Sequence, residues 1–227
     1  MRRALLVCTL AVAMLLALGG PAPGSAQEAT PEGTPEPAPA VTTPPSVGLT
    51  LRDPEGNLVG SATLVESIDD GSVTVTVTGE GMPPGEHGIH VHETGICDPA
   101  GDEPFSSAGD HFNPTGASHG GPPPSADAAA AASPIASPAG EAHAGDLGNL
   151  TVEEDGTVRF TITTDRFTLS AGDASLQDED GSALVIHADP DDLTTDPDGN
   201  AGARIACGVI FASTVAPVAS PAATPAV

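Results

Sequence analysis

All seven histidines of the chain lie in four short, glycine-rich stretches. The first contains His87, His90 and His92, the second His111 and His119, the third His143 and the fourth His187. A histidine that only packs in a core can occur singly, whereas imidazoles gathered beside carboxylates supply nitrogen ligands to metals. The distribution therefore predicts that distant parts of the chain meet at a metal centre.

The spacing of the histidines indicates how they are presented. Residues two apart on a strand share a face, so we expect His90 and His92 to project together as a two-nitrogen chelate. His187 ends another apolar stretch and can supply a third nitrogen. His87 has the parity of the core-facing residues, and we interpret it as a residue that braces the turn or supports a ligand.

A second donor set lies in loop sequence rich in glycine and proline. It comprises His111, His119, His143 and Asp146. Three imidazoles and one carboxylate suit a tetrahedral zinc ion.

The elements that must position these residues are short strands separated by tight turns. Alternating or apolar runs predict strands at 47–51, 58–65, 73–77, around 90–92, and at 150–152, 158–162, 183–187 and 205–211. No segment keeps a helical period. We therefore expect an all-β fold, an eight-stranded antiparallel barrel or sandwich with long metal-binding loops.

The ends of the chain differ in composition from its middle. Residues 1–26 carry two arginines, an apolar run of about 15 residues and a small-residue cleavage site, which predicts a signal peptide for export to the periplasm, cell envelope or exterior. Segments 27–46 and 213–227 are rich in proline and alanine and are predicted to be a disordered tether and tail. One domain is expected over 47–212, with a low-complexity insert at 122–142.

Charge excludes some partners. The chain has six basic and 31 acidic residues; removal of 1–26 would leave four basic residues and a net charge of −27. Such a surface repels nucleic acid and anionic lipid. The apolar run at the N-terminus is shorter than the roughly 20 residues of a membrane-spanning helix, so no span is expected after processing.

Two cysteines remain outside the predicted signal peptide, Cys97 and Cys207. An even pair in an exported protein is a disulfide candidate, and two separate buried thiols are the other interpretation. A bridge would close a loop of about 110 residues, which is worth roughly 4 to 5 kcal/mol in the chain-entropy model.

Several motifs, in order along the chain, resemble the copper/zinc superoxide dismutase family, in an exported bacterial form. They are HGIHVH at 87–92, GDHFNP at 109–114, HGGP at 119–122, GDLGN at 145–149, HADPDDL at 187–193 and GNAGARIACGV at 199–209. The resemblance implies a Greek-key barrel that removes superoxide by alternately reducing and reoxidising copper.

The resemblance also implies residue roles. Copper would be held by His90, His92, His111 and His187, and zinc by His111, His119, His143 and Asp146. His111 would bridge the two metals and carry a proton, and Arg204 would attract the anionic substrate. Asp191 would join a copper ligand to a zinc ligand, and Cys97 would pair with Cys207. The remaining arginines of the domain, at 52, 159 and 166, are predicted to be surface charges.

Two features depart from that family. The insert lengthens the run between His119 and His143, at a loop-closure cost on the order of 1 kcal/mol. Residues 192–199 are acidic where many relatives have basic residues, so weak steering of superoxide is expected. An exported copper-binding domain with the same fold and little turnover is the alternative function. Whether the domain is a monomer or a dimer stays open.

Overall fold

The computed structural model describes residues 43–100, 103–123 and 141–214. The predicted signal peptide, nearly all of the tether, most of the insert and most of the tail lie outside these residues. Within them no helix is long and apolar enough to cross a membrane.

Eight strands form the domain. They are β1 (Ser46–Arg52), β2 (Leu58–Glu66), β3 (Val73–Gly79), β4 (Gly85–His92), β5 (Asp146–Val152), β6 (Val158–Thr164), β7 (Ser182–His187) and β8 (Arg204–Phe211). Among the described residues the other element is a single 3₁₀ turn, η1 (Ser106–Ala108). Each predicted strand is present, most of them longer by one or two residues at an end.

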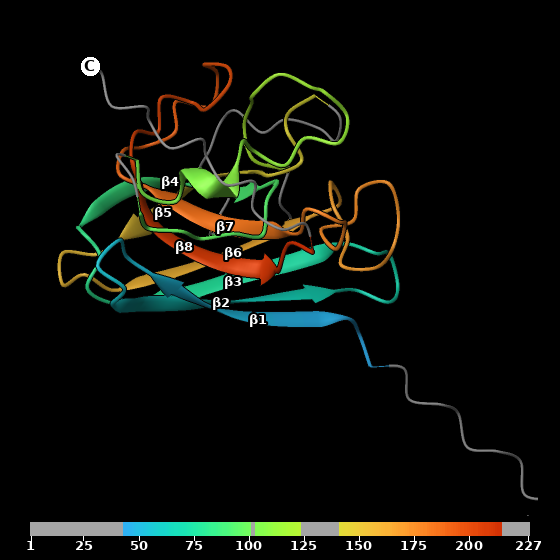
Figure 1. Cartoon of the computed structure of the whole chain (residues 1–227), viewed down its shortest axis with the longest axis horizontal. Coiled ribbons are helices and arrows are strands. Elements are labelled where there is room, and N and C mark those ends of the chain that lie inside the picture. The colour runs from blue at the N-terminus through green and yellow to red at the C-terminus, as the bar shows by residue number, and fades with distance from the viewer. Residues whose placement is uncertain (1–42, 101–102, 124–140, 215–227) are drawn as a thin grey trace, which may run out of the picture. The chain divides into compact units, whose positions relative to one another are not determined.

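The strands close into an antiparallel barrel in the order β1-β2-β3-β6-β5-β4-β7-β8, with β8 pairing back to β1 (Figure 1). Besides the closing pair of β1 with β8, two pairings, β3 with β6 and β4 with β7, join strands that are not consecutive in the chain. Such crossovers characterise the Greek-key arrangement, and closure leaves no free sheet edge. The predicted fold class is confirmed.

The two halves of the barrel show different burial patterns. On β3, Val73, Val75 and Val77 are fully buried, while the threonines between them are partly or fully exposed, as expected for a strand with one face in water. All six residues of β7 are buried. One face of β7 packs in the core, and long loops cover the other.

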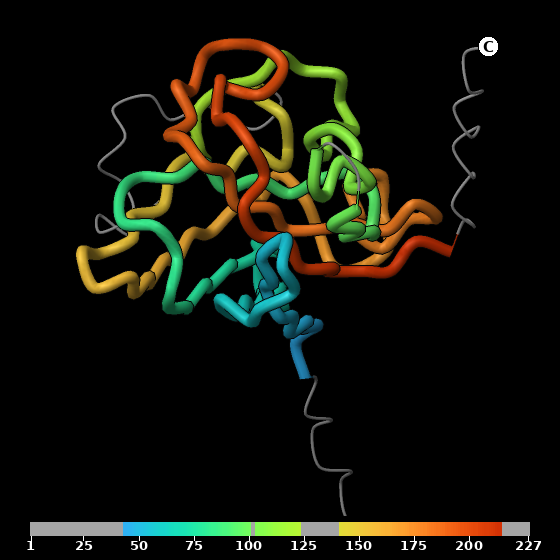
Figure 2. Tube along the Cα trace, turned by 60° about the vertical axis from the view of Figure 1, so that its left-hand side comes forward, coloured from blue at the N-terminus to red at the C-terminus, as the bar shows by residue number. Residues whose placement is uncertain are grey.

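These loops gather on one side of the barrel. Residues 93–100, 103–123 and 188–203 lie over β4 and β7, away from β1, in Figure 1, and Figure 2 shows them on the side of the trace away from its blue N-terminal strand. The first of them is tied to β8 by a disulfide between Cys97 and Cys207, residues separated by 110 positions. The predicted pairing of these cysteines is therefore present.

Candidate metal centre

The end of β4 presents a pair of histidines beneath the covering loops. His90 and His92 are at most 1% exposed, and they alternate with Ile89 and Val91, which belong to the hydrophobic core. The neighbouring β7 ends at His187, whose Nε2 lies 3.4 Å from Nε2 of His92. The strand pleat therefore delivers the two-nitrogen chelate, and the antiparallel pairing of β4 with β7 brings the third imidazole to it.

His111 completes this group from a loop. It forms an isolated antiparallel bridge with His92, and the next residue, Phe112, donates its backbone N–H to the Val91 carbonyl at 2.8 Å. The imidazole of His111 consequently lies against that of His90, with ring centroids 3.9 Å apart. His90, His92, His111 and His187 each place a ring nitrogen within 4.8 Å of the others'.

The opposite edge of His111 faces a second group, formed with His119, His143 and Asp146. Oδ1 of Asp146 lies 2.9, 3.1 and 3.4 Å from Nδ1 of His111, His119 and His143, respectively. Nδ1 of His143 is 3.4 Å from Nδ1 of His111. Four ligands placed about 2.0–2.1 Å from a tetrahedral zinc ion would lie about 3.3 Å from one another. These separations match that size.

Burial sets the protonation of the first group. It lowers the pKa of His90 and His92 well below the usual value, and the neighbouring imidazoles add to the effect. Burial likewise lowers the pKa of His187 to about 4. These rings are therefore neutral near pH 7 and have lone pairs to offer to a metal. Four imidazoles form a donor set that suits copper.

The second group is organised by a carboxylate. Burial alone would raise the pKa of Asp146, but its close contacts with the imidazoles of His111, His119 and His143 outweigh that effect and hold the pKa far below its usual range. Burial opposes the charge on His119, yet its contacts with Asp146 and Asp191 raise the pKa of His119 to about 10. The raised pKa favours a protonated His119 in the metal-free protein, and a zinc ion bound between Nδ1 of His119 and Asp146 would replace the proton on that nitrogen.

Three buried histidine nitrogens have no hydrogen-bond partner among the described residues. They are Nδ1 of His90, Nε2 of His111 and Nδ1 of His119, the last of which lies 3.1 Å from Oδ1 of Asp146 but is not aligned as a hydrogen bond. A buried polar atom without a partner costs about 1–3 kcal/mol, so it needs an explanation. The first two face the four-histidine group, and the third faces Asp146. Metal ligation would satisfy all three, so both groups fit the metals that their donors favour.

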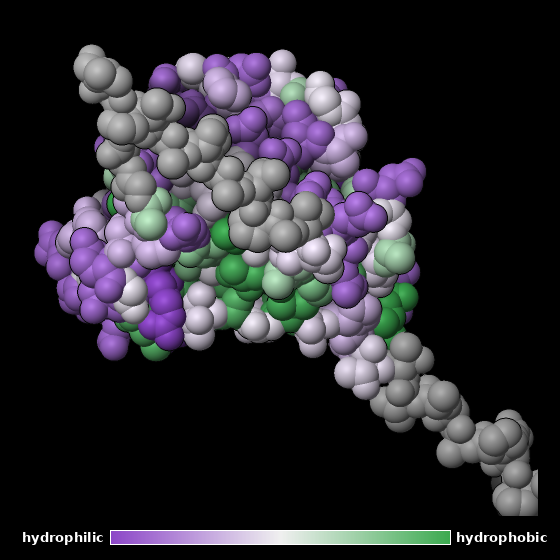
Figure 3. Space-filling view, in the orientation of Figure 1, coloured by the Kyte–Doolittle hydropathy of each residue, from purple (hydrophilic) through white to green (hydrophobic). Residues whose placement is uncertain are grey.

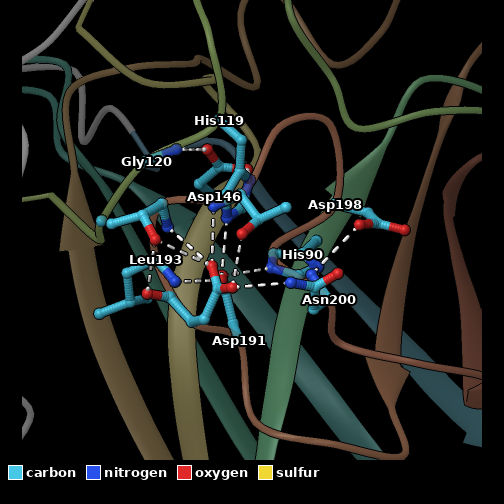
Figure 4. A network of polar contacts seen from close by, with 12 residues as sticks. His90, His119, Gly120, Asp146, Asp191, Leu193, Asp198 and Asn200 are labelled. Carbon is cyan, nitrogen blue, oxygen red and sulfur yellow. Dashed lines mark hydrogen bonds and ion pairs between the residues drawn. The ribbon is translucent and has the colours of Figure 1, made fainter.

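Asp191 joins the two groups from outside (Figure 4). Its Oδ2 lies 2.8 Å from Nε2 of His90, and its Oδ1 lies 2.9 Å from Nε2 of His119. The side-chain amide of Asn149 holds the Asp191 backbone by accepting from its N–H and donating to its carbonyl. The sequence singled out Asp191 only through the family resemblance, and the clamp of Asn149 was not predicted.

His87 is buried on β4, three residues before His90. Its two ring nitrogens lie 2.8 Å from the backbone carbonyls of His187 and Pro83. It therefore ties the start of β4 to the end of β7.

Arg204 opens β8 beside a cavity of about 780 Å³, whose lining also includes His92, His111 and His187. The guanidinium donates to the Phe105 carbonyl at 2.6 Å and to the Gly109 carbonyl at 2.7 Å. The Gly109 oxygen also lies 2.9 Å from Nδ1 of His92. The Gly109 carbonyl thus fixes the Arg204 guanidinium relative to His92.

Acidic residues surround this arginine. The cavity lining contains five carboxylates, those of Glu93, Glu103, Asp110, Asp196 and Asp198. Figure 3 shows hydrophilic residues gathered over the loops above the barrel, whereas apolar residues appear lower, near β8 and β1. Weak electrostatic attraction of anions is therefore expected on structural grounds as well.

The prediction for Arg166 was wrong. Arg52 and Arg159 are exposed as expected, but Arg166 is only 5% exposed. Its guanidinium donates to the backbone carbonyls of two residues of the second group, Asp146 at 3.1 Å and His143 at 3.4 Å. Arginine is seldom fully buried, and the flanking sequence has no signal that separates it from the other two.

Comparison with known proteins agrees with this geometry. The family model for copper/zinc superoxide dismutase matches residues 58–210. Superoxide dismutase [Cu-Zn] 2 and 1 of Aquifex aeolicus are 41% and 39% identical to the chain, over 70% and 69% of it and 83% and 82% of their own lengths. The crystal structure of a SOD-like protein from Bacillus subtilis is 36% identical and superposes with a TM-score of 0.57, over 72% of this chain and 97% of that one. The chain belongs to the copper/zinc superoxide dismutase family.

Proposed function

We propose that the protein converts two superoxide ions and two protons into oxygen and hydrogen peroxide, with copper held by His90, His92, His111 and His187 and zinc by His111, His119, His143 and Asp146. The observation that carries this proposal is the position of the His111 ring. Its Nδ1 lies 2.9 Å from Asp146, and its Nε2 is buried within the four-histidine group. A single imidazole thus offers one nitrogen to each group.

Bound copper supplies a one-electron couple, by which one superoxide is oxidised to oxygen and a second is reduced to the level of peroxide. The zinc ion has no such couple, and the group assigned to it orders the loop that carries His119 and His143.

The residues of the chain would bind substrate and move protons. The guanidinium of Arg204, held by the Phe105 and Gly109 carbonyls, presents its remaining N–H groups to an anion in the cavity. Nε2 of His111 holds a proton during one half of the cycle and delivers it to the reduced substrate in the other. Asp191 keeps the rings of His90 and His119 in orientation through its two oxygens.

We propose that this chemistry takes place outside the cytoplasm, after removal of residues 1–26. The Cys97–Cys207 disulfide supports this, because such bonds persist in oxidising compartments. Mass spectrometry of the protein secreted by the native cell would show a mature N-terminus at residue 27. Retention of residues 1–26 in the mature protein would contradict the proposal.

Metal reconstitution tests the activity. Purified apo-protein should take up one copper and one zinc ion and then remove superoxide, as followed by pulse radiolysis. His111→Ala should lose the copper–zinc pairing, visible as a changed copper electron paramagnetic resonance spectrum, and should lose most of the activity. Stoichiometric copper binding with no superoxide removal beyond that of buffer would favour the copper-sequestering alternative.

A further inference from the structure

Arg166 is a buried cation for which neither the barrel nor the proposed reaction has an evident need. It follows β6 by two residues and is 5% exposed, although the chain has only six basic residues. Burying a guanidinium carries a large desolvation penalty, which lowers the pKa of Arg166. A buried arginine is retained where its fixed fork of donors orders other groups.

The carbonyls that it contacts belong to two separate arms of the proposed zinc site. One terminal nitrogen donates to the Gly121 carbonyl at 3.0 Å, in the arm that carries His119. The other donates to the Asp146 carbonyl at 3.1 Å and, at 3.4 Å, to that of His143, in the arm that carries those two ligands. One planar group therefore spans both arms.

The two arms are far apart along the chain. The described residues stop at Pro123 and resume at Glu141, so 17 residues connect them. A longer connection raises the entropic cost of bringing its ends together. The carboxylate of Asp146 also spans the gap, since its Oδ2 accepts from the backbone N–H groups of Gly120 and His143. Arg166 adds a second link between the arms, made through their backbone carbonyls.

We propose that Arg166 is a positioning residue for zinc, a clasp that holds the arms of His119 and of His143 and Asp146 together and so preforms the site in the metal-free protein. This inference rests on the zinc site proposed above. The guanidinium donates to the backbone that carries the ligands, and through that backbone it positions them. Its positive charge also offsets that of Asp146 in the interior.

Arginine is required for this role because of its geometry. A lysine ammonium is a compact charge that cannot reach both arms in one plane, and glutamine has neither the charge nor the reach. Arg166→Lys and Arg166→Gln should therefore both weaken zinc binding. Arg159→Gln is the matched control, because Arg159 lies on β6, the strand that Arg166 follows, and is exposed.

The test uses the full secreted chain, stripped of metal, with folding verified by circular dichroism. Zinc affinity is measured by competition with a chromophoric chelator, and Co²⁺ serves as a spectroscopic probe of tetrahedral geometry. We expect both Arg166 variants to bind zinc about 10- to 100-fold more weakly and to give weaker visible cobalt bands, as for the loss of a partner that orients ligands. Arg159→Gln should match the unmodified protein in both measurements.

Other outcomes overturn the inference. If the Arg166 variants melt at lower temperature but keep the zinc affinity and cobalt spectrum of the unmodified protein, Arg166 is only a structural residue. If Arg166→Lys retains full zinc affinity while Arg166→Gln does not, the positive charge is sufficient. The proposal that the planar guanidinium holds the two arms together is then refuted. If the unmodified protein itself binds no zinc, the proposed zinc site fails first, which the same titration reveals before any variant is compared.

Discussion

Gly199 offers a sharp test of how the loop after β7 supports the metal centre. It has a φ of +64°, and a methyl group added there would collide with Oδ1 of Asp191 and approach Nε2 of His119 to 2.7 Å. Both neighbours are buried, and the Asp191 carboxylate already joins the rings of His90 and His119. Gly199→Ala should therefore displace the link between the two groups.

The loss of stability expected for Gly199→Ala has two contributions. A left-handed conformation costs a non-glycine residue about 1–2 kcal/mol. Displacing Asp191 would weaken two charge-assisted contacts, each worth about 1.5–3 kcal/mol. The control is Gly71→Ala in the β2–β3 turn, because Gly71 has a φ of +74° and a methyl group there would meet nothing within 4 Å. Gly71→Ala should lose only the stability that corresponds to the left-handed conformation.

The assay combines chemical denaturation of the metal-free variants with zinc affinity measured by chelator competition. We expect Gly71→Ala to lower the free energy of unfolding by about 1–2 kcal/mol and to leave the zinc affinity unchanged. Gly199→Ala should lower the free energy of unfolding by about 3 kcal/mol or more and should bind zinc about 10- to 100-fold more weakly. Equal losses and equal zinc affinities in the two variants would refute the reasoning, since they would show that the crowding of Asp191 has no consequence.

Three further predictions follow from the site. Raising ionic strength should leave the pulse-radiolysis rate unchanged or higher, because salt screens five cavity carboxylates against one arginine; a steep fall would contradict this. Arg204→Gln should lower kcat/KM on the order of 100-fold with copper content unchanged by elemental analysis, and an unchanged rate would remove its assigned role. Replacing Cys97 and Cys207 together by serine should lower the free energy of unfolding by roughly 4 to 5 kcal/mol, because the bridge closes a loop of 110 residues; denaturant titration of both forms measures it, and equal midpoints would sink the estimate.

Local patterns sufficed for most of the strands and for the histidine chelate, but residues 85–89 of β4 and 146–149 of β5 were not predicted as strand, and Asp146 was wrongly assigned to a loop. The alternation of Val73, Val75 and Val77 with threonines is visible without any tertiary contact, because a strand has a period of two. The same period predicted that His90 and His92 share a face. Family motifs then predicted the remaining donors, and the structure brings those donors together.

Only the tertiary structure decided what supports the donors. Arg166 and Arg159 lie on or just after the same strand, and their sequence contexts do not distinguish them, yet one is buried under the zinc-type group and the other is exposed. The clamp of Asn149 on Asp191 likewise joins residues 42 positions apart. Periodicity reports which face a side chain occupies, whereas the partner of a buried polar group is set by chain closure and loop packing, which local sequence does not encode.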